Sequence, residues 1–186
     1  MPTTVHEFAW PDRVVVGTVG APGQRTFYLQ VRTGKQIVSI ALEKQQSAQL
    51  AEKIDEILDQ LITVEGNPFH VPTSTPIELV DNDDLDPVEE QFRTGVMSLG
   101  WDPTTAQLVI EAHPLAEVEE GDDGFLADED DETDDAEEVL RVRMPVGTAR
   151  AFAKRTREIV GAGRPICVIC GQPIDADGHT CTFPEN

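Results

Sequence analysis

The chain has 186 residues, of which 39% are hydrophobic, so it can bury a core as one domain of ordinary size or two small ones. Its formal net charge of -21 repels nucleic acid and anionic membranes, and favours basic partners or metal ions. We see neither an apolar run of the roughly 20 residues that cross a bilayer nor a basic and apolar signal peptide, and therefore expect a cytoplasmic protein without a membrane partner.

Three strands and a helix are predicted at 1–62. Residues 13–19, 26–32 and 37–42 alternate or run apolar and β-branched, and Gly-containing turn signals separate them. Ser47 is the expected N-cap of the helix that follows. The apolar stripe of this helix comprises Leu50, Ile54, Ile57, Leu58 and Leu61.

The same order returns after a linker at 63–91 that several prolines interrupt. Strands are predicted at 92–99, 107–112 and 139–144, and a helix from about 147 to 160. The core-facing stripe of this second helix comprises Ala149, Phe152, Ala153, Thr156, Ile159 and Val160.

The two halves align with each other at a constant offset over the third strand and the helix. Val38 matches Leu140 and Leu50 matches Phe152, an offset of 102 residues in both cases. We interpret the chain as α+β, with two βββα units, at 1–62 and 92–162, that form an antiparallel sheet with two helices. The alternative is that any two stretches of three strands and a helix align this well by pattern alone.

An acidic stretch interrupts the second unit at 117–138. It holds 14 acidic residues and no Lys or Arg, and the rest of the chain has a net charge of only -7. A segment of this composition cannot bury enough apolar surface to fold, so we expect a solvated, disordered insertion.

The second helix carries a local cluster of cations on its predicted outer face: Arg150, Lys154, Arg155 and Arg157. Such a face could bind a phosphate or an acidic partner surface. The alternative is a solvated face that the acidic insertion of the same chain neutralises.

The last residues, 163–186, contain the pattern expected of a zinc site. Cys167, Cys170, His179 and Cys181 supply the four sulfur and nitrogen ligands that tetrahedral zinc requires. Four protein ligands leave no open position, which favours a structural Zn²⁺ over a catalytic one. The alternatives are a redox C-x-x-C pair or buried thiols, but the prolines around the pair favour a loop.

Several segments resemble an actinobacterial family known as domain of unknown function 3090. The most specific are GTVG-x-PGQRTFYLQ near the start and C-x-x-CG-x-P-(x5)-H-x-C at the end. The resemblance covers essentially the whole chain and implies that the four predicted ligands bind a metal. Members of that family typically end in a basic, aromatic stretch, whereas this chain ends TFPEN. The family is similar to one of three proteins often encoded together, the others resembling a lipid-kinase-like phosphotransferase and a histidine phosphatase.

We therefore expect a zinc-binding adaptor or regulatory protein with a protein partner, for a phosphoryl-transfer pathway. Spaced glycines in GTVGAPG precede a strand rather than a helix, and no histidine has a neighbour that would complete a catalytic pair. The competing class is an enzyme acting on a small molecule in a groove between the two units. Arg25, Tyr28 and Trp101 are the candidate residues of that groove.

The zinc motif generates the first prediction. Purified without chelator, the protein should contain one zinc per chain, and Cys167→Ser should lower that content and unfold mainly the tail. Structural zinc supplies on the order of 10 kcal/mol to a small unit without its own core. Metal analysis by mass spectrometry gives the stoichiometry, and a zinc-free preparation would contradict the assignment.

Overall fold

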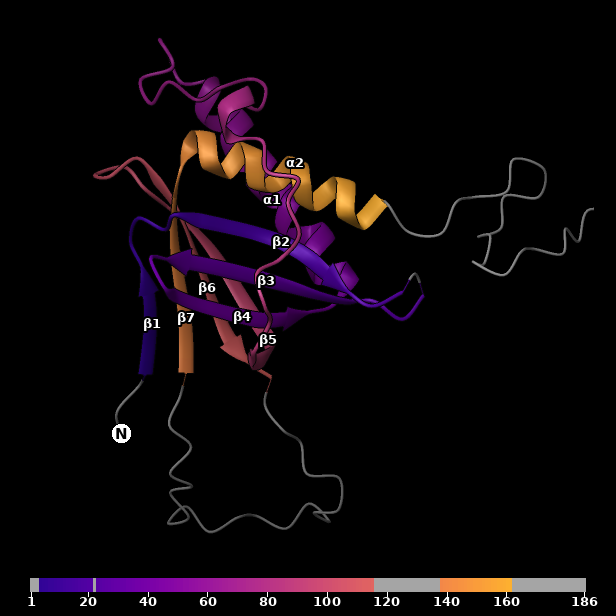
Figure 1. Cartoon of the computed structure of the whole chain (residues 1–186). Helices are drawn as coiled ribbons and strands as arrows, with labels where there is room; N and C mark the ends of the chain where they lie inside the picture. The colour runs from indigo at the N-terminus through magenta and orange to yellow at the C-terminus, as the bar shows by residue number, and fades with distance from the viewer. Residues whose placement is uncertain (1–3, 22, 116–137, 162–186) are drawn as a thin grey trace, which may run out of the picture.

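A seven-stranded sheet with two helices on one side forms the framework of the protein (Figure 1). The computed structural model describes residues 4–21, 23–115 and 138–161. In chain order the elements are β1 (Thr4–Phe8), β2 (Arg13–Val19), β3 (Thr26–Thr33), β4 (Gln36–Leu42), α1 (Lys44–Ile62), the 3-10 helix η1 (Ile77–Leu79), β5 (Glu90–Asp102), β6 (Gln107–Pro114), β7 (Glu138–Pro145) and α2 (Val146–Gly161).

The sheet is mixed, which corrects the expectation of an antiparallel one. Its strand order is β1-β7-β6-β5-β4-β3-β2, and the pairs β4–β5 and β1–β7 are parallel. The β4–β5 pair is parallel because the chain passes through α1 and the following linker before β5 starts, which brings it back to the end of the sheet where β4 began. The mixed α+β class is confirmed, while the division into two βββα units stays a prediction.

The core lies between the sheet and the helices. Val16 is opposite Leu29, Leu29 is opposite Ile40, and Ile40 is opposite Phe92, so one row of apolar side chains runs across four strands. All belong to a single buried cluster. The helices add Leu50, Ala51, Ile54, Leu58, Ala149, Phe152 and Ala153 to the same cluster. Alternation along the strands therefore places one face of the sheet under the helices.

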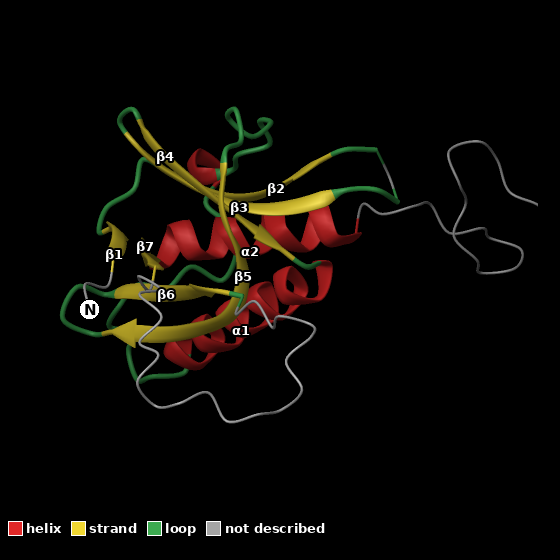
Figure 2. Cartoon of the chain, turned by 90° about the horizontal axis from the view of Figure 1, so that it is seen from below, coloured by secondary structure: helices red, strands yellow, loops and turns green. Residues whose placement is uncertain are grey.

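The helices pack side by side over this face, and α1 begins earlier than predicted (Figure 2). The N-cap is Glu43 rather than Ser47, and the main-chain N–H of Glu43 donates to Gln46 Oε1 at 2.8 Å. Gln46 Nε2 also donates to the carbonyls of Thr94 and Gly95 in β5, at 3.2 and 3.0 Å. The start of α1 is thus joined to the neighbouring part of the sheet.

Two elements were absent from the sequence prediction. Strand β1 pairs with β7 at one edge of the sheet, and η1 lies within the predicted linker. Among the described residues, no helix is long and apolar enough to cross a membrane. The acidic insertion at 117–138, except Glu138, and the predicted zinc tail at 163–186 lie outside the described residues.

The continuous core row predicts a large difference between two isoleucines of β4. Ile40→Ala should lower the free energy of unfolding by about 2–5 kcal/mol, because the side chain is fully buried and leaves a cavity. Ile37→Ala is the matched control. The Ile37 side chain is 38% exposed, so its removal should lower the free energy of unfolding much less. Urea denaturation measures both, and equal losses would contradict the assigned register.

Candidate functional site

A polar segment wraps around the edge of the sheet before β5, and we call these residues, 80–86, the strap. Leu79, which precedes it, lies beside Gly147 of α2. Further along, Leu85 lies so close to Gly17 of β2 that any side chain at Gly17 would collide with it. Successive residues of a strand face opposite sides of the sheet, and Val16 faces the helices. Gly17 therefore contributes to the face away from the helices. The strap therefore passes from the helix side to the opposite face of the sheet, across β2 (Figure 1).

Arg13, the first residue of β2, holds the strap from the sheet. Its Nε and Nη2 donate to the two carboxylate oxygens of Asp81, at 2.7 and 3.1 Å. Nη2 also donates to the main-chain oxygens of Asp83 and Asp84, at 2.9 and 3.0 Å. A two-pronged contact between guanidinium and carboxylate is both strong and specific in direction.

Arg155 holds the strap from α2 and is only 9% exposed. Its Nε donates to the carbonyl of Val16 at 3.0 Å, and Nη2 donates to the carbonyl of Asp83 at 2.7 Å. Nη1 donates to both the carbonyl and the carboxylate of Asp81, at 2.6 and 3.2 Å. Since β2 is an edge strand, Arg155 supplies a donor to a carbonyl that faces no neighbouring strand. One side chain thus joins helix, sheet and strap.

Strand β3 binds the far end of the strap through Asp86. Arg32 Nη1 lies 3.0 Å from Asp86 Oδ2, and Arg13 Nη1 lies 3.4 Å from the same oxygen. The side-chain amide of Gln30 donates to the carbonyl of Asp86 at 3.0 Å and accepts from its main-chain N–H at 2.8 Å. The strap is therefore fixed at both ends by β2, β3 and α2.

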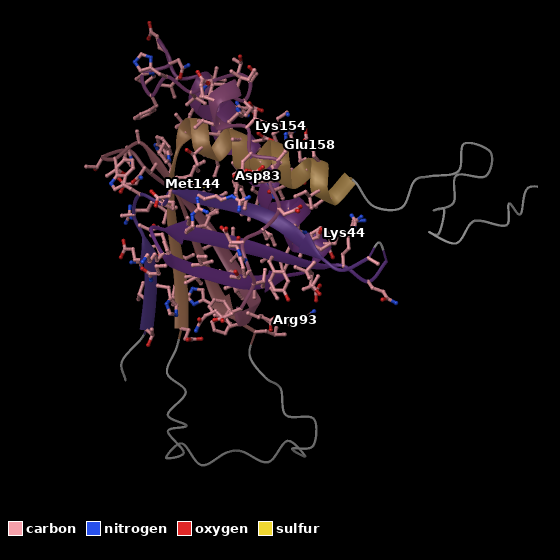
Figure 3. All side chains as sticks on the ribbon, viewed as in Figure 1. Lys44, Asp83, Arg93, Met144, Lys154 and Glu158 are labelled. Carbon is pink, nitrogen blue, oxygen red and sulfur yellow. The ribbon has the colours of Figure 1, made fainter. Side chains whose placement is uncertain are left out.

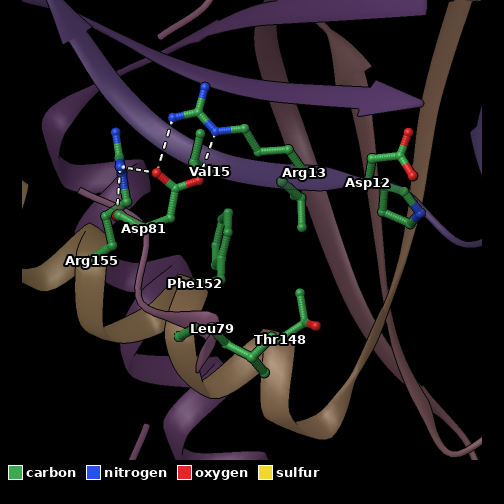
Figure 4. A pocket seen from close by; sticks show the side chains of 11 residues that line it. Asp12, Arg13, Val15, Leu79, Asp81, Thr148, Phe152 and Arg155 are labelled. Carbon is green, nitrogen blue, oxygen red and sulfur yellow. Dashed lines mark hydrogen bonds and ion pairs between the residues drawn. The ribbon is translucent and has the colours of Figure 1, made fainter. Parts of the chain in front are cut away.

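Two cavities adjoin the strap, and Arg155 lines both. The smaller, of about 120 Å³, has an apolar wall of Val14, Val15 and Phe152, with Asp81 lying between the guanidinium groups of Arg13 and Arg155 (Figure 4). The larger, of about 320 Å³, is mostly polar. Its lining residues are Gly17, Thr18, Gly20, Arg25, Asn82, Asp83, Asp84, Leu85, Arg155, Glu158 and Ile159.

The charges in this region shift one another's protonation. Hydrogen bonding from Arg13 lowers the pKa of the Asp81 carboxyl below its ordinary value, and the Asp83 N–H and the Arg155 charge act in the same direction. Asp81 raises the pKa of Arg13 in turn, chiefly through their hydrogen bond. Burial lowers the pKa of Arg155. Asp81 is therefore ionised at neutral pH, so it suits binding an arginine better than exchanging protons.

The four cations predicted on the outer face of the second helix lie in different environments. Arg155 is buried at the strap, and Arg150 is 6% exposed between the helices, where it binds Asp55 and Asp59 of α1 at 2.9 and 2.8 Å. Neither arginine is therefore on an outer face: the Arg150 side of α2 packs against α1, and the Arg155 side faces β2 and the strap.

The remaining two cations are at the surface. Arg157 lies 3.0 Å from Asp55 of α1, and Lys154 lies 3.0 Å from Glu158, one turn further along α2 (Figure 3). Each thus has an anionic partner within the described part of the chain. Anion binding by the four predicted cations stays a prediction.

The structure does not bring the three predicted groove residues together. Arg25 lines the larger cavity, whereas Tyr28 lies on the face of the sheet away from the helices, 3.5 Å from Glu90. Trp101 packs on the helix side, edge-on to Phe69, with 5.0 Å between ring centroids. Burial and the Glu90 charge raise the pKa of Tyr28, so its hydroxyl stays protonated.

The predicted zinc ligands, Cys167, Cys170, His179 and Cys181, all lie outside the described residues. Within residues 4–21, 23–115 and 138–161 there is no group of three or more His, Cys, Asp or Glu side chains that could hold a metal ion. The assignment of zinc to the tail therefore stays a prediction.

Sequence reasoning missed the arginine cluster because its members lie far apart in the chain. The one feature of the sequence that pointed to this site is the group of four aspartates in DNDDLD at 81–86. No basic residue is adjacent to this segment in the sequence. Their partners come from β2, β3 and α2, and only the folded topology reveals them.

Comparison with known proteins identifies a family. The sequence model of the family described as Protein of unknown function (DUF3090) matches residues 6–181, which include both cavities and the predicted zinc ligands. No curated protein and no solved structure matches the chain.

The strap contacts predict how stability depends on pH. Asp81→Asn should lower the free energy of unfolding by about 1–3 kcal/mol near neutral pH, because it leaves buried guanidinium donors poorly paired. The pKa of Asp81 is lowered in the folded state, so its contribution is present above the ordinary value near 4 and is lost as pH falls through the folded value. The difference between wild type and variant should therefore shrink on acidification. Glu52→Gln, at an exposed residue of α1, is the control and should change little.

Proposed function

The chain belongs to the DUF3090 family, and we propose that it is a zinc-binding adaptor or regulatory protein of the cytoplasm, serving a phosphoryl-transfer pathway. Its partner would be a lipid-kinase-like phosphotransferase or a histidine phosphatase. The observation that carries the proposal is the full engagement of Arg155, which donates to three carbonyls and one carboxylate of its own chain.

This engagement favours binding over catalysis. A guanidinium that stabilises a transition state must direct donors at the place where charge develops, and those of Arg155 are directed at the strap. A general acid or base works best with a pKa near the operating pH, whereas Asp81 and Asp102 are shifted downward and Tyr28 upward. The resolved shifts therefore move these groups away from proton transfer near neutrality.

The place where α2 ends supports a docking role for the residues that follow it. Helix α2 ends at Gly161, two residues after Ile159, which lines the larger cavity. A partner that contacts the start of the tail would thus also reach the polar rim formed by the strap. A segment of 24 residues, such as 163–186, is too short to form a hydrophobic core of its own. Structural zinc often supplies the folding free energy for such segments, and would do so for a docking tail.

We also propose that the fold contains two related βββα units. Strand β4 begins at Gln36 and β7 at Glu138, while α1 begins at Lys44 and α2 at Val146, so both pairs are offset by 102 residues. With β1 left aside, each helix follows three strands: β2 to β4 precede α1, and β5 to β7 precede α2. Equal spacing of strand and helix supports a common origin of the two halves.

An enzyme acting on a small molecule is the second candidate. The cavity of about 320 Å³ favours it, because small-molecule sites typically measure about 300–1,000 Å³. Arg25, one of its lining residues, would bind the substrate. Tyr28 and Trp101 would then have no part in that site, since neither lines the cavity.

Binding to the two proposed partners tests the function. The tagged protein should form a stoichiometric complex with the purified phosphotransferase or phosphatase on size-exclusion chromatography. The double variant Cys167→Ser, Cys170→Ser should lose the complex while retaining the thermal transition of the core. Glu52→Gln is the surface control and should bind like wild type. Absence of a complex with either partner, together with Arg25-dependent turnover of a small molecule, would favour the enzyme.

A further inference from the structure

We infer that Arg13, Arg32 and Arg155 form a binding site for a phosphoryl group, which the strap occupies with its own carboxylates. The site is separate from the zinc tail and does not depend on the proposed adaptor role. Its ligand would be a phosphate monoester, whose phosphoryl oxygens take the places of the Asp81 and Asp86 carboxylates when the strap moves away.

The three guanidinium groups converge from three different elements. Asp81 binds Arg13 of β2 and Arg155 of α2, and Asp86 binds Arg13 and Arg32 of β3. Arg13 is therefore shared between the two carboxylates. A phosphoryl group presents several acceptor oxygens on one atom, and arginine binds such oxygens in the same two-pronged way as a carboxylate.

The site requires an anion, whatever its source. The side chains of Arg13 and Arg155 are each only 10% exposed, and a buried cation without a counter-charge is strongly destabilising. Asp81 and Asp86 supply that counter-charge in the closed form. A phosphate dianion would supply the same two charges.

The strap has little apolar attachment of its own. Val80 is 40% exposed, and Leu85, which packs against Gly17, is only half-buried. Segments that pack few apolar side chains open more readily than the core. Four aspartates lie within these seven residues, so opening would also relieve their mutual repulsion.

The smaller cavity would take the organic part of the ligand. Its wall of Val14, Ala151 and Phe152 is apolar, and its volume is about 120 Å³. An enclosed apolar cavity of about 150 Å³ accepts benzene, so a phenyl ring would fill this smaller cavity and extend beyond its opening. Arg13 and Arg155 border the same cavity, so a small aromatic or alkyl ester would place its phosphate beside both guanidinium groups (Figure 4).

Calorimetric titration with inorganic phosphate and with phenyl phosphate tests this inference. The double variant Asp81→Asn, Asp86→Asn should bind both probes at least about tenfold more tightly than wild type, because the internal competitor is weakened. Phenyl phosphate should bind more tightly than phosphate, because its ring occupies the smaller cavity. Adding Arg13→Gln to the double variant should abolish the gain.

The matched control is Asp55→Asn, Asp59→Asn, which changes the net charge equally but beside Arg150 and Arg157. An equal gain in that control would show a general charge effect and overturn the site. No gain in a folded Asp81→Asn, Asp86→Asn variant would overturn it as well.

A measurement on the wild-type chain covers the case in which the double variant does not fold. Phenyl phosphate should speed hydrogen exchange of the strap amides relative to chloride at equal ionic strength, while the core strands stay unchanged. Unchanged exchange in the strap at saturating probe would refute displacement.

Discussion

The contact of Arg155 with Val16, Asp81 and Asp83 is the interaction on which the arrangement of the sheet edge depends. It replaces the neighbour that edge strand β2 lacks, and it fixes α2 against that edge. The cost of burying a guanidinium is offset here by hydrogen bonds from all three of its nitrogens. Loss of any one acceptor would leave a buried donor unpaired, so the helix, the edge and the strap each contribute to burying this guanidinium.

The path of the strap also accounts for the topology. The chain leaves β4, forms α1 on the helix side, rounds the outer edge at β2 and returns on the opposite face to begin β5 beside β4. The strands β2, β3 and β4 are thus enclosed by a single stretch of chain. Leu85 packs directly on Gly17, and only a residue without a side chain leaves room for it there.

Much of the fold could be predicted because the spacing of apolar residues along a strand or helix indicates which of its sides is buried. The strand at 13–19 matches β2, and the apolar stripes of both helices are the ones that face the core. Strand β1 was missed because it is short and only Phe8 is buried. Parallel pairing was missed because it depends on the route of the connection, which carries no periodic signal.

The candidate site was harder to predict, since charge in sequence does not reveal which face of a helix packs. Arg150 and Asp55 look like surface residues in isolated helices, yet they meet where α1 and α2 face each other. The strap looks like a solvated linker because it is acidic, and its charge is what binds it to three arginines. Screening by salt has little direct effect on apolar packing, whereas a segment held by ion pairs responds to ionic strength and competing anions. The strap is therefore suited to changing position without disturbing the core.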